Sequence, residues 1–85
     1  SMASLIQRLA DRDIRLELTD GARAFIARSS YSPAYGARPV KRYLQKFVET
    51  ELAAMLIRGQ LSDGQRVRID SDGSALSFRT EGQDI

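Results

Sequence analysis

The sequence predicts a small α+β domain with three helices and a small sheet, in the order helix, strand, helix, helix and β-hairpin. Apolar residues recur in steps of three and four along residues 39–58, the spacing of one helix face. They alternate with polar residues along 14–18, 66–70 and 75–79, the spacing of half-buried strands. At 85 residues the chain is long enough for one domain with a modest core.

The first half of the chain contributes two helices and a strand. Apolar residues at helical spacing predict a helix from Ser4 to about Asp11, and residues 1–3 are interpreted as a cloning scar. The alternation at 14–18 predicts a strand. Thr19 is expected to cap a second helix that ends near Ser29. The inward face of that helix is expected to consist of Ala22, Phe25 and Ile26.

The third helix is predicted to be the longest element. Pro39 suits the first turn, where a missing amide hydrogen is tolerated, and Gly59 supplies a left-handed stop, so the helix is expected to cover Pro39 to about Arg58. We expect its inward face to consist of Val40, Tyr43, Leu44, Phe47, Val48, Leu52, Met55 and Leu56.

A hairpin is predicted after this helix. Residues 66–70 and 75–79 alternate on either side of the turn at Asp72-Gly73. We expect the apolar side chains of the two strands to face each other, Val67 and Ile69 opposite Leu76 and Phe78. Residues 80–85 are expected to form a flexible tail, so the domain itself would cover residues 4–79.

The composition excludes several kinds of chemistry. The chain contains no cysteine and no histidine, which removes disulfides, the usual zinc sites, thiol nucleophiles and the commonest general base. No apolar run approaches the roughly 20 residues that cross a bilayer, so we expect no membrane contact. The lack of cysteine and of a signal peptide suits a cytoplasmic protein. The formal charge of +2 permits phosphate or nucleic-acid binding without demanding it.

The third helix begins with positive charge. Arg38, Lys41, Arg42 and Lys46 have no acidic residue between them, and cations at a helix N-terminus cost about 0.3–1 kcal/mol each through the helix dipole. A bound anion would offset that cost, with free amides of the first turn and the Arg38 guanidinium directed toward it. The candidate phosphate-binding residues are Gly36, Ala37, Arg38 and Lys41.

A second interpretation of these charges stays open. A basic stripe opposite an apolar one is the ordinary condition of an amphipathic helix, and Lys46 and Arg58 are assigned to solvent on that ground. Tyr31 and Tyr35 in the preceding loop are of the type that stacks on bases, but we expect them to fasten the loop onto the core.

The segment from Tyr31 to Arg42, YSPAYGARPVKR, resembles the loop and helix start of the C-terminal small domain in Clp-family AAA+ unfoldases. It is most similar to the second AAA+ module of ClpB-type disaggregases. The resemblance extends over about Ile14 to Phe78, and the Gly-Ala-Arg-Pro core is specific when it stands in this element order. Related protease-coupled unfoldases carry a similar small domain, so both branches stay open.

The resemblance implies a role in an ATP-dependent motor. Arg38 would be the sensor-2 arginine, the catalytic contribution of this chain, which reaches the phosphates of ATP bound with Mg²⁺ on the preceding AAA+ large domain. The domain would swing with nucleotide state and help assemble a homohexamer that pulls on unfolded or aggregated proteins.

This chain by itself is not expected to be an enzyme. No Gly-x-x-x-x-Gly-Lys-Ser/Thr phosphate loop occurs in it, so the chain has neither a triphosphate cradle nor the hydroxyl that accompanies magnesium. It would act as one part of an ATP-hydrolysing protein, and we expect it to bind free ATP or ADP weakly if at all.

Two alternatives come from other functional classes. The element order is also that of a winged-helix DNA-binding domain, but residues 59–85 hold three basic and five acidic residues, a charge that phosphate repels. Nucleic acid is therefore not the expected partner. A purely structural oligomerisation domain would keep the same fold and leave Arg38 without a ligand.

Overall fold

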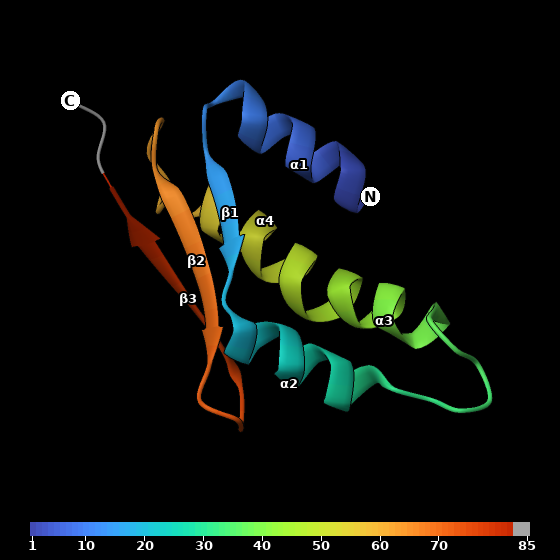
Figure 1. The fold of residues 1–85 in the computed structure, drawn as a ribbon. Helices are drawn as coiled ribbons and strands as arrows, with labels where there is room; N and C mark the ends of the chain where they lie inside the picture. Colours follow the sequence, from blue (N-terminus) through green and yellow to red (C-terminus); the bar gives the residue numbers. More distant parts are fainter. Residues whose placement is uncertain (83–85) are drawn as a thin grey trace.

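A computed structural model describes residues 1–82, and the rest of the predicted tail, residues 83–85, lies outside the described residues. The helices lie on one side of a three-stranded sheet (Figure 1), which confirms the predicted α+β class. The elements are α1 (Met2–Asp11), β1 (Arg15–Leu18), α2 (Asp20–Ser30), α3 (Arg38–Tyr43), the π-helical segment η1 (Leu44–Glu49), α4 (Thr50–Ile57), β2 (Arg66–Ser71) and β3 (Leu76–Glu81).

The sheet has the strand order β1-β2-β3. The predicted hairpin of β2 and β3 is confirmed, and β1 pairs with β2 in parallel, which the sequence analysis did not predict. Ile69 lies opposite Phe78 as expected, whereas the expected partners of Val67 were wrong. Val67 lies opposite Thr80, because β3 continues to Glu81 and takes in two residues that were assigned to the tail.

The core lies between the sheet and the helices. Leu52 of α4 and Val67 and Ile69 of β2 are completely buried, and Leu9 of α1 is 1% exposed. Burying a side chain of this kind contributes about 1.5–3 kcal/mol, so these contacts between α4, α1 and β2 are the main source of stability. α1 begins at Met2, so the segment interpreted as a scar is partly helical. No helix among residues 1–82 is long and apolar enough to cross a membrane.

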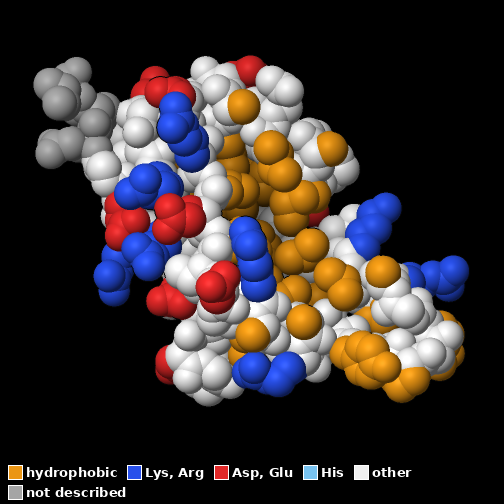
Figure 2. Space-filling model, in the orientation of Figure 1, with side chains coloured by type: hydrophobic (Ala, Val, Ile, Leu, Met, Phe, Trp, Pro, Cys, Tyr) orange, Lys and Arg blue, Asp and Glu red, His pale blue; other side chains and the backbone are white. Residues whose placement is uncertain are grey.

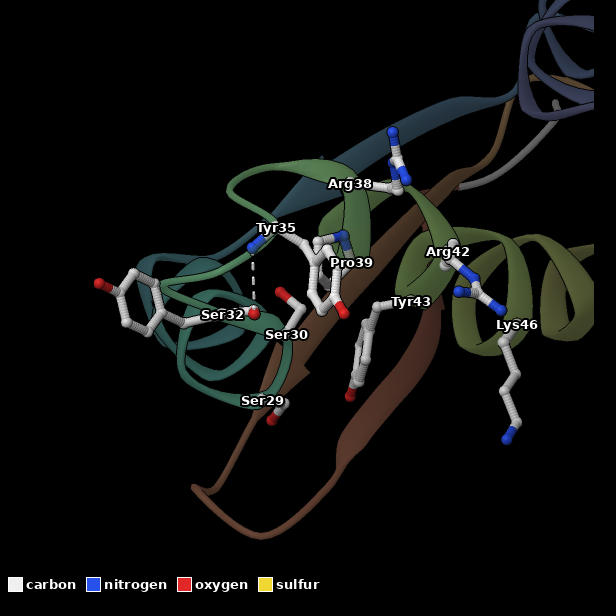
Figure 3. Close-up of a pocket in the computed structure, with 10 residues that line it drawn as sticks. Ser29, Ser30, Ser32, Tyr35, Arg38, Pro39, Arg42, Tyr43 and Lys46 are labelled. Atoms are coloured by element: carbon white, nitrogen blue, oxygen red, sulfur yellow. Dashed lines mark hydrogen bonds between the residues drawn. The ribbon is translucent and has the colours of Figure 1, made fainter.

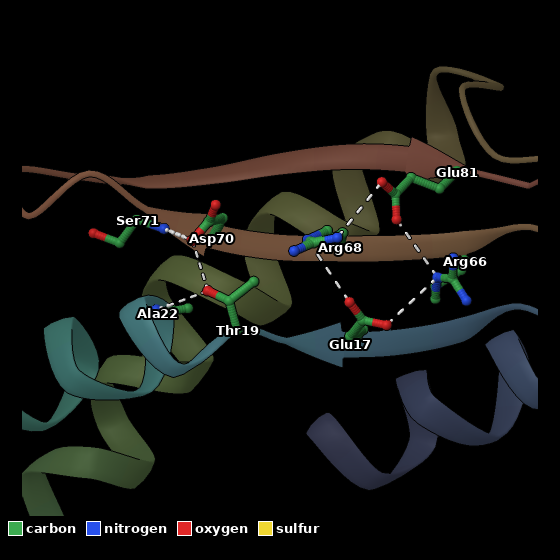
Figure 4. Close-up of polar contacts among 8 residues, drawn as sticks. All are labelled: Glu17, Thr19, Ala22, Arg66, Arg68, Asp70, Ser71 and Glu81. Atoms are coloured by element: carbon green, nitrogen blue, oxygen red, sulfur yellow. Dashed lines mark hydrogen bonds and ion pairs between the residues drawn. The ribbon is translucent and has the colours of Figure 1, made fainter.

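The outer face of the sheet is charged (Figure 4). Arg66 and Arg68 each lie between Glu17 and Glu81, with nitrogen-to-oxygen distances of 3.5 to 3.9 Å. These side chains are partly exposed and the distances exceed those of good hydrogen bonds, so the network contributes little to stability.

Thr19 joins α2 to the hairpin (Figure 4). Its hydroxyl oxygen accepts a hydrogen bond from the Ala22 amide at 3.1 Å, which confirms the predicted N-cap. The same hydroxyl donates to Asp70 Oδ1 at 2.6 Å. This bond and a second one from the Ser71 amide hold the pKa of Asp70 below its ordinary value.

The long helix has the predicted extent but not the predicted uniformity. It runs without a break through α3, η1 and α4, and Gly59 ends it with φ +71° as expected. Six central residues are π-helical. Within this segment Phe47 is 46% exposed rather than inward as expected, and Val48 is buried.

Candidate functional site

The candidate site lies at the end of the molecule farthest from the sheet. The loop of residues 31–37 projects there before α3 begins (Figure 1), and α3 has no buried residue. Apolar and tyrosine side chains gather on this projection, with Lys and Arg side chains standing clear of the surface beside it (Figure 2). The predicted phosphate-binding residues therefore lie on exposed structure, open to a partner.

A tight turn in the loop sets the start of α3. Ser32 and Gly36 form an isolated antiparallel bridge, in which the Gly36 amide donates to the Ser32 carbonyl at 3.0 Å. The Ser32 hydroxyl accepts from the Tyr35 amide at 3.4 Å. Gly36 has φ +61°, a left-handed conformation that glycine adopts without strain. Gly36 therefore shapes the turn that delivers Arg38 to its position.

Several amides at the start of α3 already donate hydrogen bonds within the turn. The amide of Gly36 is used within the turn, and the Arg38 amide donates to the Tyr35 carbonyl at 3.3 Å. Pro39 has no amide hydrogen, and the Val40 amide donates to Ala37 at 3.1 Å. The Arg38 and Val40 amides are therefore engaged inside the turn, and the Arg38 side chain remains exposed.

Three cationic side chains border one hollow of about 600 Å³ beside the loop (Figure 3). They are those of Arg38, Arg42 and Lys46, all exposed, and none makes an ion pair within residues 1–82. Figure 3 shows the Arg38 guanidinium pointing away from Tyr43. We call this space the loop hollow; its complete lining is Ser29, Ser30, Tyr31, Ser32, Tyr35, Arg38, Pro39, Arg42, Tyr43 and Lys46.

The structure separates residues that the sequence analysis grouped together. Lys41 and Ala37 do not line the loop hollow. They line a second space, together with Val40 of α3 and with Met2 at the start of α1. Lys46 had been assigned to solvent, yet it lies beside the loop hollow with Arg42. Arg42 and Lys46 are four residues apart, and this spacing puts two residues on the same face of a helix. The spacing therefore indicates from the sequence that the two side chains lie close together.

The loop tyrosines do not fasten the loop onto the core, which corrects a second expectation. Tyr31 is 73% exposed and Tyr35 is 67% exposed. The bridge between Ser32 and Gly36 holds the loop together locally, so the tyrosine rings are not needed as anchors. Both rings border the loop hollow and are available to a neighbouring surface.

A second hollow of about 640 Å³, lined by several aromatic side chains, lies next to the loop hollow and shares Tyr43 with it. The Tyr43 and Phe47 rings lie with their centroids 4.5 Å apart, and the Lys46 ammonium lies 5.3 Å from the Phe47 centroid. We call this space the aromatic hollow; its lining is Phe25, Tyr43, Phe47, Glu51, Ser74, Ala75, Leu76 and Phe78.

The site has the means to bind an anion. Residues 1–82 contain no cluster of three or more acidic, histidine or cysteine side chains that could hold a metal ion. The cations around the loop hollow offer charge and hydrogen-bond donors to phosphate or carboxylate oxygens. Its lining contains no histidine or carboxylate; the groups there that can exchange protons are three tyrosines and Lys46.

Comparison with known proteins identifies the family. The model of the "C-terminal, D2-small domain, of ClpB protein" matches residues 1–69. The chaperone protein ClpB of Nitratidesulfovibrio vulgaris is 55% identical over 74 residues, which are 87% of this chain and 9% of that protein. ClpB of Agrobacterium fabrum is 47% identical over 77 residues, 91% of this chain and 9% of the relative.

ClpB of Aquifex aeolicus is 49% identical over 77 residues, 91% of this chain and 8% of the relative. The chain therefore spans less than a tenth of the length of these relatives. The matched region includes α1, β1, α2, the whole long helix and most of β2. On the family match and these identities, the chain belongs to the family of ClpB C-terminal D2-small domains.

Proposed function

We propose that this chain is the lid of the second AAA+ module of an ATP-dependent chaperone, in which Arg38 contacts the phosphates of ATP on the preceding large domain. The observation that carries the proposal is the state of Arg38. Its side chain is exposed, makes no ion pair within residues 1–82, and follows a turn that Gly36 shapes at the tip of the molecule.

The residues present fit part of a nucleotide site. A guanidinium exposed at this end of the molecule offers an always protonated donor to the charge that develops on a transferring phosphoryl group. The amides of Gly36, Arg38 and Val40 donate within the turn, and residues 1–82 offer no cluster of metal-binding side chains. In this proposal the phosphate cradle and the magnesium ligands come from the large domain, and this chain contributes the Arg38 side chain.

The test is ATP turnover in a protein that joins the large domain to this chain. Arg38→Ala is expected to lower turnover by about 10- to 1,000-fold, the range for loss of a preorganised donor at a developing charge. Arg23→Ala is the matched control, because Arg23 is also an exposed helix residue without an ion pair among residues 1–82. Equal turnover in the Arg38 variant and the control would refute the proposal.

We also propose that the domain helps assemble a hexameric ring that acts on unfolded or aggregated proteins in the cytoplasm, with the aromatic hollow packing on a neighbouring subunit. Phe47 supports this role, because it exposes 46% of its surface among half-buried Phe25 and Phe78. In the protein with the large domain attached, Phe47→Asp should lower the fraction of hexamer measured by sedimentation velocity. The circular dichroism spectrum of the 85-residue chain should stay unchanged. A hexamer fraction equal to wild type would remove this part of the proposal.

A further inference from the structure

The π-helical segment Leu44–Glu49 divides the long helix between the exposed α3 and the buried α4. A π-helix closes its hydrogen bonds at i→i+5 rather than i→i+4, and such segments are rare and often found at functional sites. Its position is notable here because Arg38 lies on one side of it and the core contacts of Leu52 and Met55 lie on the other.

The spacing of the apolar residues explains why the segment is needed. Val40, Leu44, Val48 and Leu52 follow one another at intervals of four residues. In an α-helix each residue turns by about 100°, so three such intervals drift by about 120° and would carry Val40 away from the face of Leu52. In the structure Val48 and Leu52 are buried, Leu44 packs against the core cluster and Val40 is half-buried. The wider turn of the π segment absorbs the drift.

A side-chain hydrogen bond accompanies the wider turn. The Thr50 hydroxyl donates to the Gln45 carbonyl at 3.1 Å, five residues earlier. In regular α-helix a serine or threonine hydroxyl bonds the carbonyl four residues earlier, as Ser30 does with Ile26 in α2. The hydroxyl of Thr50 therefore fits the π geometry and supports it.

We infer that the π segment sets the direction of Arg38 relative to the core, with Thr50 as a positioning residue. Uniform α-helical winding of the same residues would turn α3 by about 100° relative to α4, and Arg38 with it. No residue of α3 is buried, so α3 itself has no full core contact that would fix its orientation. This inference rests on the proposed function of Arg38, and it adds the part of the helix that sets the direction of that residue.

Deleting one residue from the segment is the main test. Removal of Gln45, which is exposed, turns the apolar intervals into steps of four, three and four, so an unbroken α-helix would hold Val40, Leu52 and Arg38 in their present directions. In the protein with the large domain attached, this deletion should keep ATP turnover within about threefold of wild type. Deletion of Ala53 in α4 is the control, because there the loss of one residue rotates the two halves by about 100°.

The hydroxyl of Thr50 is tested separately in the 85-residue chain. Thr50→Val should speed amide hydrogen exchange across Leu44–Glu49 about three- to tenfold, the effect of losing one hydrogen bond, and Thr50→Ser should restore the rate. When Gln45 is also deleted, Thr50→Val should have no effect, because no π segment remains to support. Equal exchange in the valine and serine variants would contradict the role of Thr50.

The outcomes separate this inference from the proposed function. If Arg38→Ala lowers turnover and deletion of Gln45 lowers it as much, or unfolds the chain as deletion of Ala53 does, Arg38 keeps its function and the inference is overturned. If Arg38→Ala has no effect, the proposed function fails. The inference about direction then depends on the distance between spin labels at Arg42 and Arg79, which should be unchanged by deletion of Gln45; a change would overturn it.

Discussion

The two ends of the long helix differ although they form one continuous element. α4 buries Leu52 and Met55 against the sheet, whereas α3 buries no residue and carries the exposed Arg38 and Arg42. The first end makes contacts that stabilise the fold within the chain, and the second displays cations next to the loop that exposes Tyr31 and Tyr35. Stability and the proposed function are therefore separable. Substitutions in α4 should lower stability, whereas substitutions of the exposed cations of α3 should leave stability unchanged and lower the proposed function.

Truncation in α4 should have the largest effect on stability. Leu52→Ala removes a completely buried side chain between the helix and β2, and is expected to lower the free energy of unfolding by about 2–5 kcal/mol. Urea denaturation measures this loss. Ile57→Ala in the same element is the control, because Ile57 is 86% exposed and its loss should cost no more than about 0.5 kcal/mol. Similar losses for both variants would contradict the assigned core.

The junction between α2 and the hairpin should show an intermediate effect. Thr19→Ala removes both the cap on the Ala22 amide and the donor to Asp70, at an expected cost of about 1–2 kcal/mol. A double-mutant cycle with Asp70→Asn, followed by thermal unfolding, isolates the bond between the two side chains. Strict additivity would show that this bond contributes nothing.

The dependence of stability on pH should be smaller. Hydrogen bonds from Thr19 and Ser71 lower the pKa of Asp70, and those from Ser74 and Ala75 lower the pKa of Asp72. A carboxyl whose pKa is lower in the folded state stabilises the fold above its unfolded pKa of about 4, and this contribution is lost as the pH falls through the folded value. Thermal melts from pH 7 to pH 2 should show a smaller decline for Asp70→Asn than for wild type; identical declines would exclude Asp70 as a contributor.

At the exposed end, substitution should leave stability unchanged. Arg38→Gln removes a side chain without a core contact or an ion pair among residues 1–82, so the free energy of unfolding should change by no more than about 0.5 kcal/mol. Urea denaturation beside Leu52→Ala makes the comparison direct. A loss above 1 kcal/mol, on the order of one hydrogen bond, would show that α3 contributes to the fold.

Sequence reasoning succeeded where one local pattern decides the outcome. The Thr19 cap, the Gly59 stop and the alternation of Arg66 to Asp70 depend on neighbouring residues, and each is found in the structure. The family followed from the segment around Gly36, and it leaves the winged-helix alternative without support.

The parts that sequence reasoning missed depend on distant contacts or on accumulated geometry. Parallel pairing of β1 with β2 joins segments about 50 residues apart, which no local pattern encodes. The π segment is associated with intervals of four residues that each exceed the α-helical repeat, so the mismatch accumulates over several turns. The bonds that the Arg38 and Val40 amides make within the turn depend on the loop conformation, which no spacing in the sequence indicated.

The most direct test of the account is a structure of this chain joined to the preceding large domain, determined with a non-hydrolysable ATP analogue and Mg²⁺. The account predicts that an Arg38 guanidinium nitrogen lies about 2.7–2.9 Å from a β- or γ-phosphate oxygen, with the cluster around Leu52 unchanged. A nucleotide bound with Arg38 in solvent, or held by Arg42 and Lys46 in its place, would contradict it.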